Sequence, residues 1–112
     1  MRAETLKGHL DGLLLASLEA GPRHGYAIME ALRAGSGGQF DLPTGTVYPA
    51  LRRLEQAGLI RGTWSEAAGR RRRVYALTPA GRRTLAAERG TWRQFSAAVT
   101  ALLQPAPRPV TP

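Results

Sequence analysis

The segment "PTGTVYPALRRLEQAGLI", Pro43 to Ile60, decides the fold because it joins a regular apolar stripe to an unusual polar surface. Val47, Leu51 and Leu54 recur at the spacing of one helix face, so they predict an amphipathic helix with this face turned inward. Thr44 is predicted to cap the start of this helix with its hydroxyl group. The segment therefore indicates a helix that packs on a small core and exposes its other side.

The outer surface of this helix differs from that of an ordinary exposed helix, which prefers Ala, Glu and Lys. It carries Thr46, Tyr48, Pro49, Arg52, Arg53 and Gln56. Guanidinium groups bind guanine edges and phosphates, hydroxyls bind phosphates, and small apolar groups contact thymine methyls. Pro49 forfeits a backbone hydrogen bond, at a cost of up to about 3 kcal/mol in a helix interior. It marks either a contact surface or a local kink without consequence. The whole surface predicts a helix that reads the DNA major groove.

Two shorter amphipathic helices are predicted before this segment. The first has a leucine stripe and the second lies within "HGYAIMEALRAG"; their apolar positions are Leu6, Leu10, Leu13, Leu14 and Leu18, then Tyr26, Ile28, Met29 and Leu32. After Gly58, "LIRGTWS" and "RVYAL" are short, rich in β-branched and aromatic residues, and predict a two-stranded hairpin. Three helices followed by a hairpin are the plan of a winged helix-turn-helix, in which the hairpin is the wing.

The tip of the predicted hairpin carries the arginine run from Arg70 to Arg73. A wing beside a recognition helix reaches the DNA backbone or minor groove, where negative potential favours arginine. We therefore expect Arg70, Arg71 and Arg72 to contact DNA and Arg73 to belong increasingly to the strand. The alternative for such a run is a solvated charged turn.

The last predicted helix starts with Thr78 as cap and Pro79 in the first position, and it runs to about Leu103. Its apolar stripe consists of Leu85, Trp92, Phe95, Val99 and Leu102. A helix of about 25 residues is roughly 37 Å long, whereas the rest of the chain, if compact, has a radius of gyration of about 11–12 Å. One small domain does not cover such a stripe, so we expect a homodimer with these residues at its interface. Trp92 is either an anchor of that interface or part of a cavity that stacks planar aromatic ligands.

Composition narrows the classes of function. The chain has 112 residues, enough for one domain, and 16 Lys and Arg against 8 Asp and Glu give a net charge of +8. This excess suggests a polyanionic partner. There is no cysteine, no carboxylate cluster accompanies His9 or His24, and no spacing pairs a nucleophile with a base. We expect no metal, no cofactor and no catalytic residue. No segment approaches the about 18 apolar residues of a membrane span, so we expect a soluble, cytoplasmic protein.

The chain resembles the PadR family of bacterial transcriptional regulators through "HGYAIMEAL", "LPTGTVYPALRRLEQAGLI", "GRRRRVYALTPAG" and the helix of Trp92. The resemblance implies a winged helix-turn-helix repressor whose C-terminal helix makes the dimer. With a single C-terminal helix, the chain is similar to the short subgroup, some members of which bind drug-like or phenolic effectors between the subunits. Arg71 stands where the family's "GRPRK" wing motif has proline, which indicates a looser wing.

These observations predict a mainly α fold with a small β-hairpin. Residues 1–78 form the DNA-binding domain, residues 79–104 the dimerisation helix and residues 105–112 an extended, disordered Pro-rich tail. The expected function is that of a repressor that binds a palindromic operator as a homodimer and is released by a small aromatic effector. The expected DNA-binding residues, with Tyr26 added by the resemblance, are Tyr26, Thr44, Thr46, Tyr48, Pro49, Arg52, Arg53, Arg70, Arg71 and Arg72. The alternative is a winged-helix module that binds proteins, which requires an interaction face poor in arginine and rich in apolar anchors.

Overall fold

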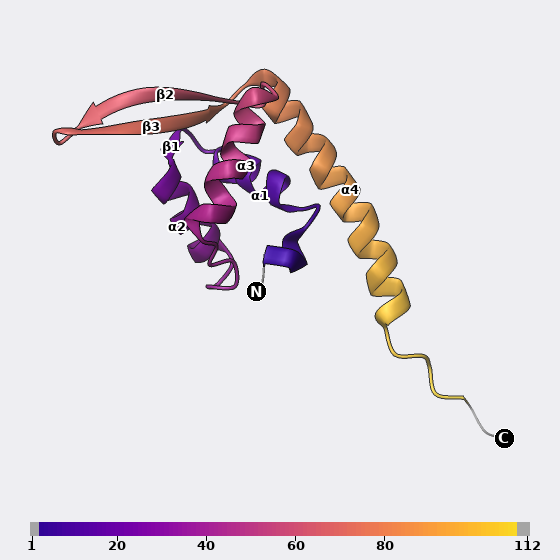
Figure 1. Cartoon of the computed structure of the whole chain (residues 1–112). Coiled ribbons are helices and arrows are strands. Elements are labelled where there is room, and N and C mark those ends of the chain that lie inside the picture. The colour runs from indigo at the N-terminus through magenta and orange to yellow at the C-terminus, as the bar shows by residue number, and fades with distance from the viewer. Residues whose placement is uncertain (1–2, 110–112) are drawn as a thin grey trace.

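A computed structural model describes residues 3–109 of the chain. The elements follow one another as a 3₁₀ turn at Ala3–Leu6, α1 Leu10–Ser17, β1 Arg23–His24, α2 Gly25–Gly35, α3 Thr44–Gln56, β2 Ile60–Ala67, β3 Arg70–Leu77 and α4 Pro79–Leu103 (Figure 1). This order confirms the predicted winged helix-turn-helix with a long C-terminal helix. The hairpin of β2 and β3 is the wing.

The core lies between the helices and the base of the wing. Its buried side chains are Leu6, Leu14, Leu15, Leu18, Ile28, Leu32, Leu42, Val47, Ala50, Leu51, Leu54, Ile60, Tyr75 and Leu85. The predicted inner face of α3 is confirmed, because Val47, Leu51 and Leu54 are all buried. The stripe predicted for α1 is only partly correct, since Leu15 is fully buried while Leu10 and Leu13 lie at the edge of the core. The short α1 packs against α2, α3 and α4, and a helix with neighbours on several sides buries more than one stripe.

Helix α3 begins one residue earlier than its predicted cap implies. Pro43 occupies the cap position with an extended backbone, and Thr44 is the first helical residue, so the prediction that the Thr44 hydroxyl caps the helix is wrong. The Pro43 carbonyl accepts the amides of Thr46 and Val47 instead. Pro49 lies inside α3, and the helix continues past it to Gln56. The proline therefore forfeits one hydrogen bond without ending the helix.

The sheet has three strands in the order β1-β3-β2, and the prediction of a two-stranded hairpin missed the third. The short β1 pairs with β3 through Arg23–Tyr75 and His24–Val74. The turn of the wing consists of Ala68 and Gly69, both with positive φ, at 53° and 73°. Such a turn matches the twist of paired strands, so β2 and β3 stay paired up to it. The arginine run therefore lies in strand β3. The prediction that it forms the tip of the hairpin is wrong.

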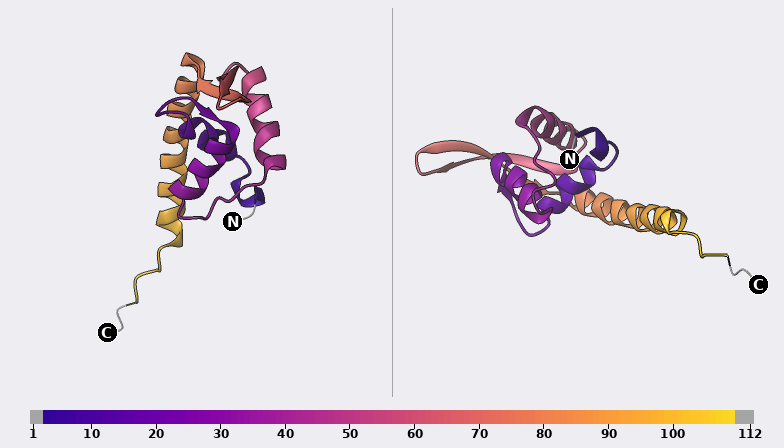
Figure 2. Two further views of the ribbon diagram at one scale, coloured as in Figure 1. Left: turned by 90° about the vertical axis from the view of Figure 1, so that its left-hand side faces the viewer. Right: turned by 90° about the horizontal axis from the view of Figure 1, so that it is seen from below.

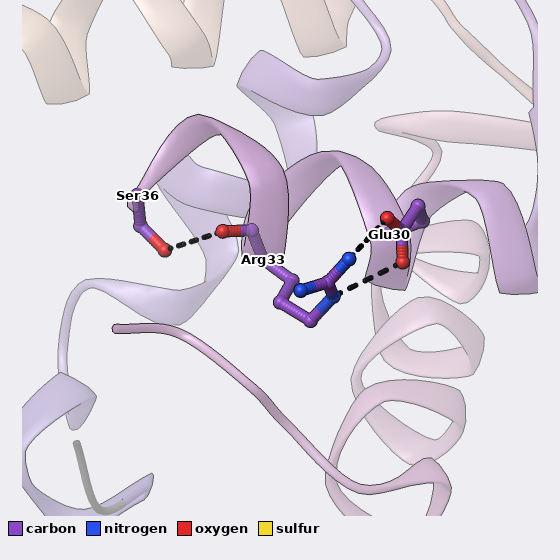
Figure 3. A network of polar contacts seen from close by, with 3 residues as sticks. All are labelled: Glu30, Arg33 and Ser36. Carbon is purple, nitrogen blue, oxygen red and sulfur yellow. Dashed lines mark hydrogen bonds and ion pairs between the residues drawn. The ribbon is translucent and has the colours of Figure 1, made fainter. Parts of the chain in front are cut away.

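Helix α2 ends in a local network of polar contacts (Figure 3). The guanidinium of Arg33 donates to both carboxylate oxygens of Glu30, at 3.2 and 2.6 Å, and the Ser36 hydroxyl donates to the Arg33 carbonyl. The same hydroxyl accepts the amide of Phe40 at 2.9 Å. The network ends α2 and directs the loop toward α3. It also pairs the charge of Arg33 with that of Glu30 on the surface of the protein.

Helix α4 starts as predicted, because the Thr78 hydroxyl accepts the Gly81 amide at 3.1 Å and Pro79 is the first helical residue. In Figure 2, α4 lies on the opposite side of the domain from α3, and its far end extends away from the domain in the direction opposite to the wing. Residues 104–109 follow it without helix or strand and are exposed. The last part of the predicted tail, residues 110–112, lies outside the described residues.

Candidate nucleic-acid interface

The outer face of α3 and the inner part of the wing line one groove. Its walls are Tyr48, Arg52, Glu55, Gln56, Arg73 and Tyr75. Both the predicted reading helix and the arginine-bearing strand β3 contribute to it. The two surfaces therefore open toward the same side, which is the arrangement that a single DNA duplex requires.

The N-terminus of α2 joins these two surfaces. The Tyr48 hydroxyl lies so close to Gly25 that a Cβ atom there would be 2.5 Å from it, so any larger residue would have to displace the Tyr48 ring. The neighbouring His24 is the cap residue of α2, and its Nε2 atom lies 3.1 Å from Nη1 of Arg72 in the wing. Elements α2, α3 and β3 thus meet at one place.

An ion pair fixes the base of the wing to α3. Nη2 of Arg73 lies 2.5 Å from Oε2 of Glu55, and both side chains are about one-third exposed, at 31% and 30%. The hydrogen bond that Arg73 donates to the Glu55 carboxylate raises the pKa of Arg73, so this guanidinium stays charged. Beside it, burial raises the pKa of Tyr75, whose side chain closes the bottom of the groove. Arg73 therefore anchors the wing and is separate from the exposed arginines that precede it.

The sequence interpretation missed a role for Trp64, which lies on the wing and is 56% exposed. The guanidinium carbon of Arg71 lies 4.5 Å from the centre of a Trp64 ring, and that of Arg73 lies 5.4 Å from it. These are cation–π distances. Trp64 is the strand partner of Arg73. Counting back from a two-residue turn would have revealed this neighbour, but the predicted turn was too long.

The remaining predicted DNA-binding residues differ in their exposure and in whether they form ion pairs within the protein. Arg52 is exposed and makes no ion pair within residues 3–109, whereas Arg53 donates to the Asp11 carboxylate of α1. Arg53 is therefore already engaged by the protein, although more than half of its side chain is exposed, at 58%. The others lie on α2, on the first half of α3 or on the wing, and all are exposed except the half-buried Thr46: Tyr26, Thr44, Thr46, Pro49, Arg70, Arg71 and Arg72.

The predicted interface stripe of α4 divides into a buried and an exposed part. Leu85 is only 3% exposed and packs in the core of its own chain, so its assignment to a dimer interface is wrong. The first turns of α4 lie against the domain and bury it there. Trp92 and Phe95 are each 52% exposed, Val99 is half-buried and Leu102 is exposed.

Trp92 and Phe95 form a small aromatic cluster with His9, which precedes α1. The ring centres of Trp92 and Phe95 are 5.9 Å apart, and those of His9 and Trp92 are 5.2 Å apart in an edge-on arrangement. This cluster lies on the exposed side of α4, and we assign it to a candidate interface.

Two other kinds of site are absent from the described part of the chain. No three His, Cys, Asp or Glu side chains between residues 3 and 109 come together to hold a metal ion. Nor does that part contain a helix long and apolar enough to cross a membrane.

The fold and the groove define the class of protein: a winged helix-turn-helix with a long additional helix. Residues 14–87 match the family described as the transcriptional regulator PadR-like family. A PadR family transcription regulator of Clostridium difficile has a similar solved structure, with a TM-score of 0.77, 33% identity, and 86% of this chain and 99% of that chain covered. The chain belongs to the PadR-like family. This family is a family of transcriptional regulators and not of enzymes, as predicted.

Two relatives in sequence are longer than this chain. An uncharacterised 37.1 kDa protein of transposon TN4556 from Streptomyces fradiae is 42% identical over 78% of this chain, which spans 24% of that protein. The transcriptional regulator Rv3488 of Mycobacterium tuberculosis is 40% identical over 60% of this chain, which spans 50% of it. This chain thus corresponds to a quarter of one relative and half of the other.

Proposed function

We propose that this protein binds DNA sequence-specifically as a homodimer and represses transcription. One observation carries the proposal: the outer face of α3 and the arginine-rich strand β3 line the same groove. A duplex placed there would meet hydroxyl and guanidinium groups from α3 and a row of exposed guanidinium groups from the wing. The net charge of +8 favours such a polyanionic partner.

Each set of residues has a distinct role in this proposal. The first half of α3, with Thr46, Tyr48 and Pro49, meets base edges in the major groove, and Arg52 binds a guanine edge or a phosphate. Tyr26 and Thr44 bind the DNA backbone beside them. The wing residues Arg70, Arg71 and Arg72 bind phosphates or enter the minor groove. Arg53 would take part only if it exchanged Asp11 for a phosphate.

The homodimer would form through the exposed part of α4, with Trp92, Phe95, Val99 and Leu102 against a second copy. A two-fold dimer presents two equal reading helices, so its operator would be palindromic, with half-sites about one helical turn apart. Occupation of such an operator would block access to a promoter, which makes repression the expected result. The protein would act in the cytoplasm, where bacterial DNA lies.

The effector of this proposed repressor would be a small planar aromatic compound held between two Trp92 side chains. The support is the half-exposed indole and the aromatic rings beside it. Titration of Trp92 fluorescence with a panel of planar compounds tests it, with Trp64→Phe as background so that Trp92 is the remaining tryptophan. We expect quenching by some compounds; a flat response across the panel contradicts the effector proposal.

Selection of bound fragments from a random duplex pool tests the proposal as a whole. We expect a palindromic consensus; absence of enrichment would favour a protein-binding module. The wing is tested on the selected duplex with Arg70→Ala and Arg72→Ala together. Each lost phosphate contact reduces the log–log salt slope of binding by about 0.9. The two wings of a bound dimer together lose four such contacts, so the slope should fall by about 3.6. An unchanged slope would remove these residues from the interface.

A further inference from the structure

His24 has a role at the start of α2 that determines the state of its ring. Its Nδ1 atom accepts the backbone amide of Ala27 at 3.3 Å and so caps the helix. A neutral imidazole has one acceptor nitrogen and one N–H group. If Nδ1 accepts, then Nε2 carries the hydrogen. His24 is therefore a hydrogen-bond donor on the side that faces the wing.

The group that Nε2 faces is also a donor. Nη1 of Arg72 lies 3.1 Å from Nε2, and a guanidinium has no acceptor. The other tautomer would accept from Arg72 but would give up the helix cap, so a neutral ring cannot satisfy both contacts. The imidazolium would lose the cap and add a second positive charge. In every protonation state of the ring, at least one of these groups lacks its best partner.

An oxygen acceptor between the two nitrogens would resolve this conflict. Neither His24 nor Arg72 forms an ion pair with a carboxylate within the part of the chain that the structure describes. Arg72 is exposed, and Gly25, next to His24, lies against the Tyr48 hydroxyl. The two donors therefore converge at the junction of the reading helix and the wing.

We infer that His24 and Arg72 together bind one phosphate group of the DNA backbone. His24 thereby joins the phosphate-binding residues, although its sequence position suggested only the start of a helix. The inference rests on the proposed function. One phosphate oxygen accepts from both Nε2 and the guanidinium, as charged acceptors commonly do. The helix cap supplies the preorganisation, because it holds the ring in the tautomer that donates toward the DNA.

Two substitutions separate the cap from the phosphate contact. In His24→Asn, the amide oxygen replaces Nδ1 as a helix cap, but nothing replaces Nε2. In His24→Gln, the amide nitrogen reaches the place of Nε2, but the cap is lost. The first variant should keep its stability and lose DNA affinity. The second should keep most of its affinity and melt about 5 °C lower, the effect of a lost cap in a small domain.

The experiment measures the affinity of the full chain for the selected duplex and for an unrelated duplex at low salt. A phosphate contact is independent of sequence, so His24→Asn should weaken binding to both by a similar factor. We expect about tenfold for each half-site, the effect of one hydrogen bond to a charged group, and so about a hundredfold for the dimer. In the Arg72→Ala background the same change should cost less than about threefold for each half-site, because the shared phosphate is already poorly held.

Other results would overturn the inference. His24→Asn could bind as tightly as the parent protein, or it could lose the same factor with and without Arg72; either result shows that no phosphate is shared. Nitrogen NMR of the His24 ring supplies an independent readout, with the hydrogen expected on Nε2 in the free protein, and a hydrogen on Nδ1 would refute the argument. If the parent protein binds neither duplex, the proposed function itself fails.

Discussion

The two tryptophans of this protein are almost equally exposed, yet their surroundings differ in every respect. Trp64 is 56% exposed on the wing and has arginines over its ring, whereas Trp92 is 52% exposed on α4 and has aromatic neighbours. Exposure alone therefore does not identify the partner of an exposed aromatic residue. The ring of Trp64 holds the guanidinium of Arg71 in a position where it can bind a polyanion. Trp92 is part of an apolar patch, which is most stable when a second apolar surface covers it.

The largest expected effect comes from Trp92→Ala, which should dissociate the proposed homodimer. Covering about 100 Å² of each indole contributes roughly 2.5 kcal/mol at about 25 cal/mol/Å², and a two-fold dimer loses this twice. The dissociation constant should therefore rise by about three to four orders of magnitude. Sedimentation equilibrium over a range of protein concentrations measures this directly.

The control for this prediction is the other tryptophan. Trp64→Ala removes the same type of side chain with nearly the same exposure, but from the wing, so the dimer should persist unchanged. If both variants dissociate alike, the difference between the aromatic neighbours of Trp92 and the arginine neighbours of Trp64 does not determine which ring lies at the dimer interface. A Trp92→Ala protein that stays dimeric would remove this patch from the interface.

Gly81→Ala should cause the next largest effect. It disturbs the start of α4, the helix that bears the apolar patch around Trp92. A Cβ atom at Gly81 would lie 2.0 Å from the carbonyl oxygen of Leu59, a backbone atom that cannot turn aside. We expect a loss of about 3 kcal/mol or somewhat more in the free energy of unfolding, the upper end for overpacked positions. Urea denaturation measures it.

Gly90→Ala in the same helix is the matched control. The nearest atom to a Cβ there is the end of the Arg93 side chain at 3.9 Å, so the methyl group fits. Alanine is a better helix former than glycine by about 1 kcal/mol, so this variant should be more stable than the parent. Equal losses at both glycines would show that α4 does not pack at Leu59 as described.

Trp64→Ala should have a smaller effect, on DNA binding alone. The ring positions Arg71, and an exposed cation–π contact contributes about 0.5–1 kcal/mol, so affinity should fall by about two- to fivefold for each half-site. Trp64→Phe, which keeps an aromatic face, should recover part of this loss. Fluorescence anisotropy with a labelled duplex measures the three proteins. An alanine variant that binds like the parent would mean that the ring does not hold Arg71 in place for DNA.

The sequence predicted those parts of the molecule that depend on local periodicity and end signals. The inner face of α3 followed from helical spacing, and the start of α4 followed from Thr78 and Pro79. What it missed depends on contacts distant in sequence. Strand β1 is only two residues long and forms because β3 offers a free edge.

The same limit explains the errors at the candidate sites. Leu85 lies on the apolar stripe of α4, but whether a residue of that stripe meets its own domain or a partner depends on where the domain ends. The pairing of Arg53 with Asp11 joins α3 to α1, and no local pattern of charges reveals it. The proposed donor pair of His24 and Arg72 likewise requires the register between β1 and β3.

The smallest expected effect concerns the ion pair that holds α4 beside α1. Arg89 donates to both carboxylate oxygens of Glu19, at 2.6 and 2.9 Å, and this hydrogen bonding lowers the pKa of Glu19 below its ordinary value of 4.5. A carboxylate with a lowered folded pKa contributes stability above the unfolded pKa, and that contribution is lost as the pH falls through the folded value. Glu19→Gln should therefore lower the urea midpoint slightly at pH 7, and the difference from the parent should vanish in acid. Glu30, whose pKa Arg33 also lowers, is present in both proteins, so its own titration cancels from the difference. A gap between the two midpoints that stays constant below about pH 4 would show that the Glu19 side chain acts through something other than its charge.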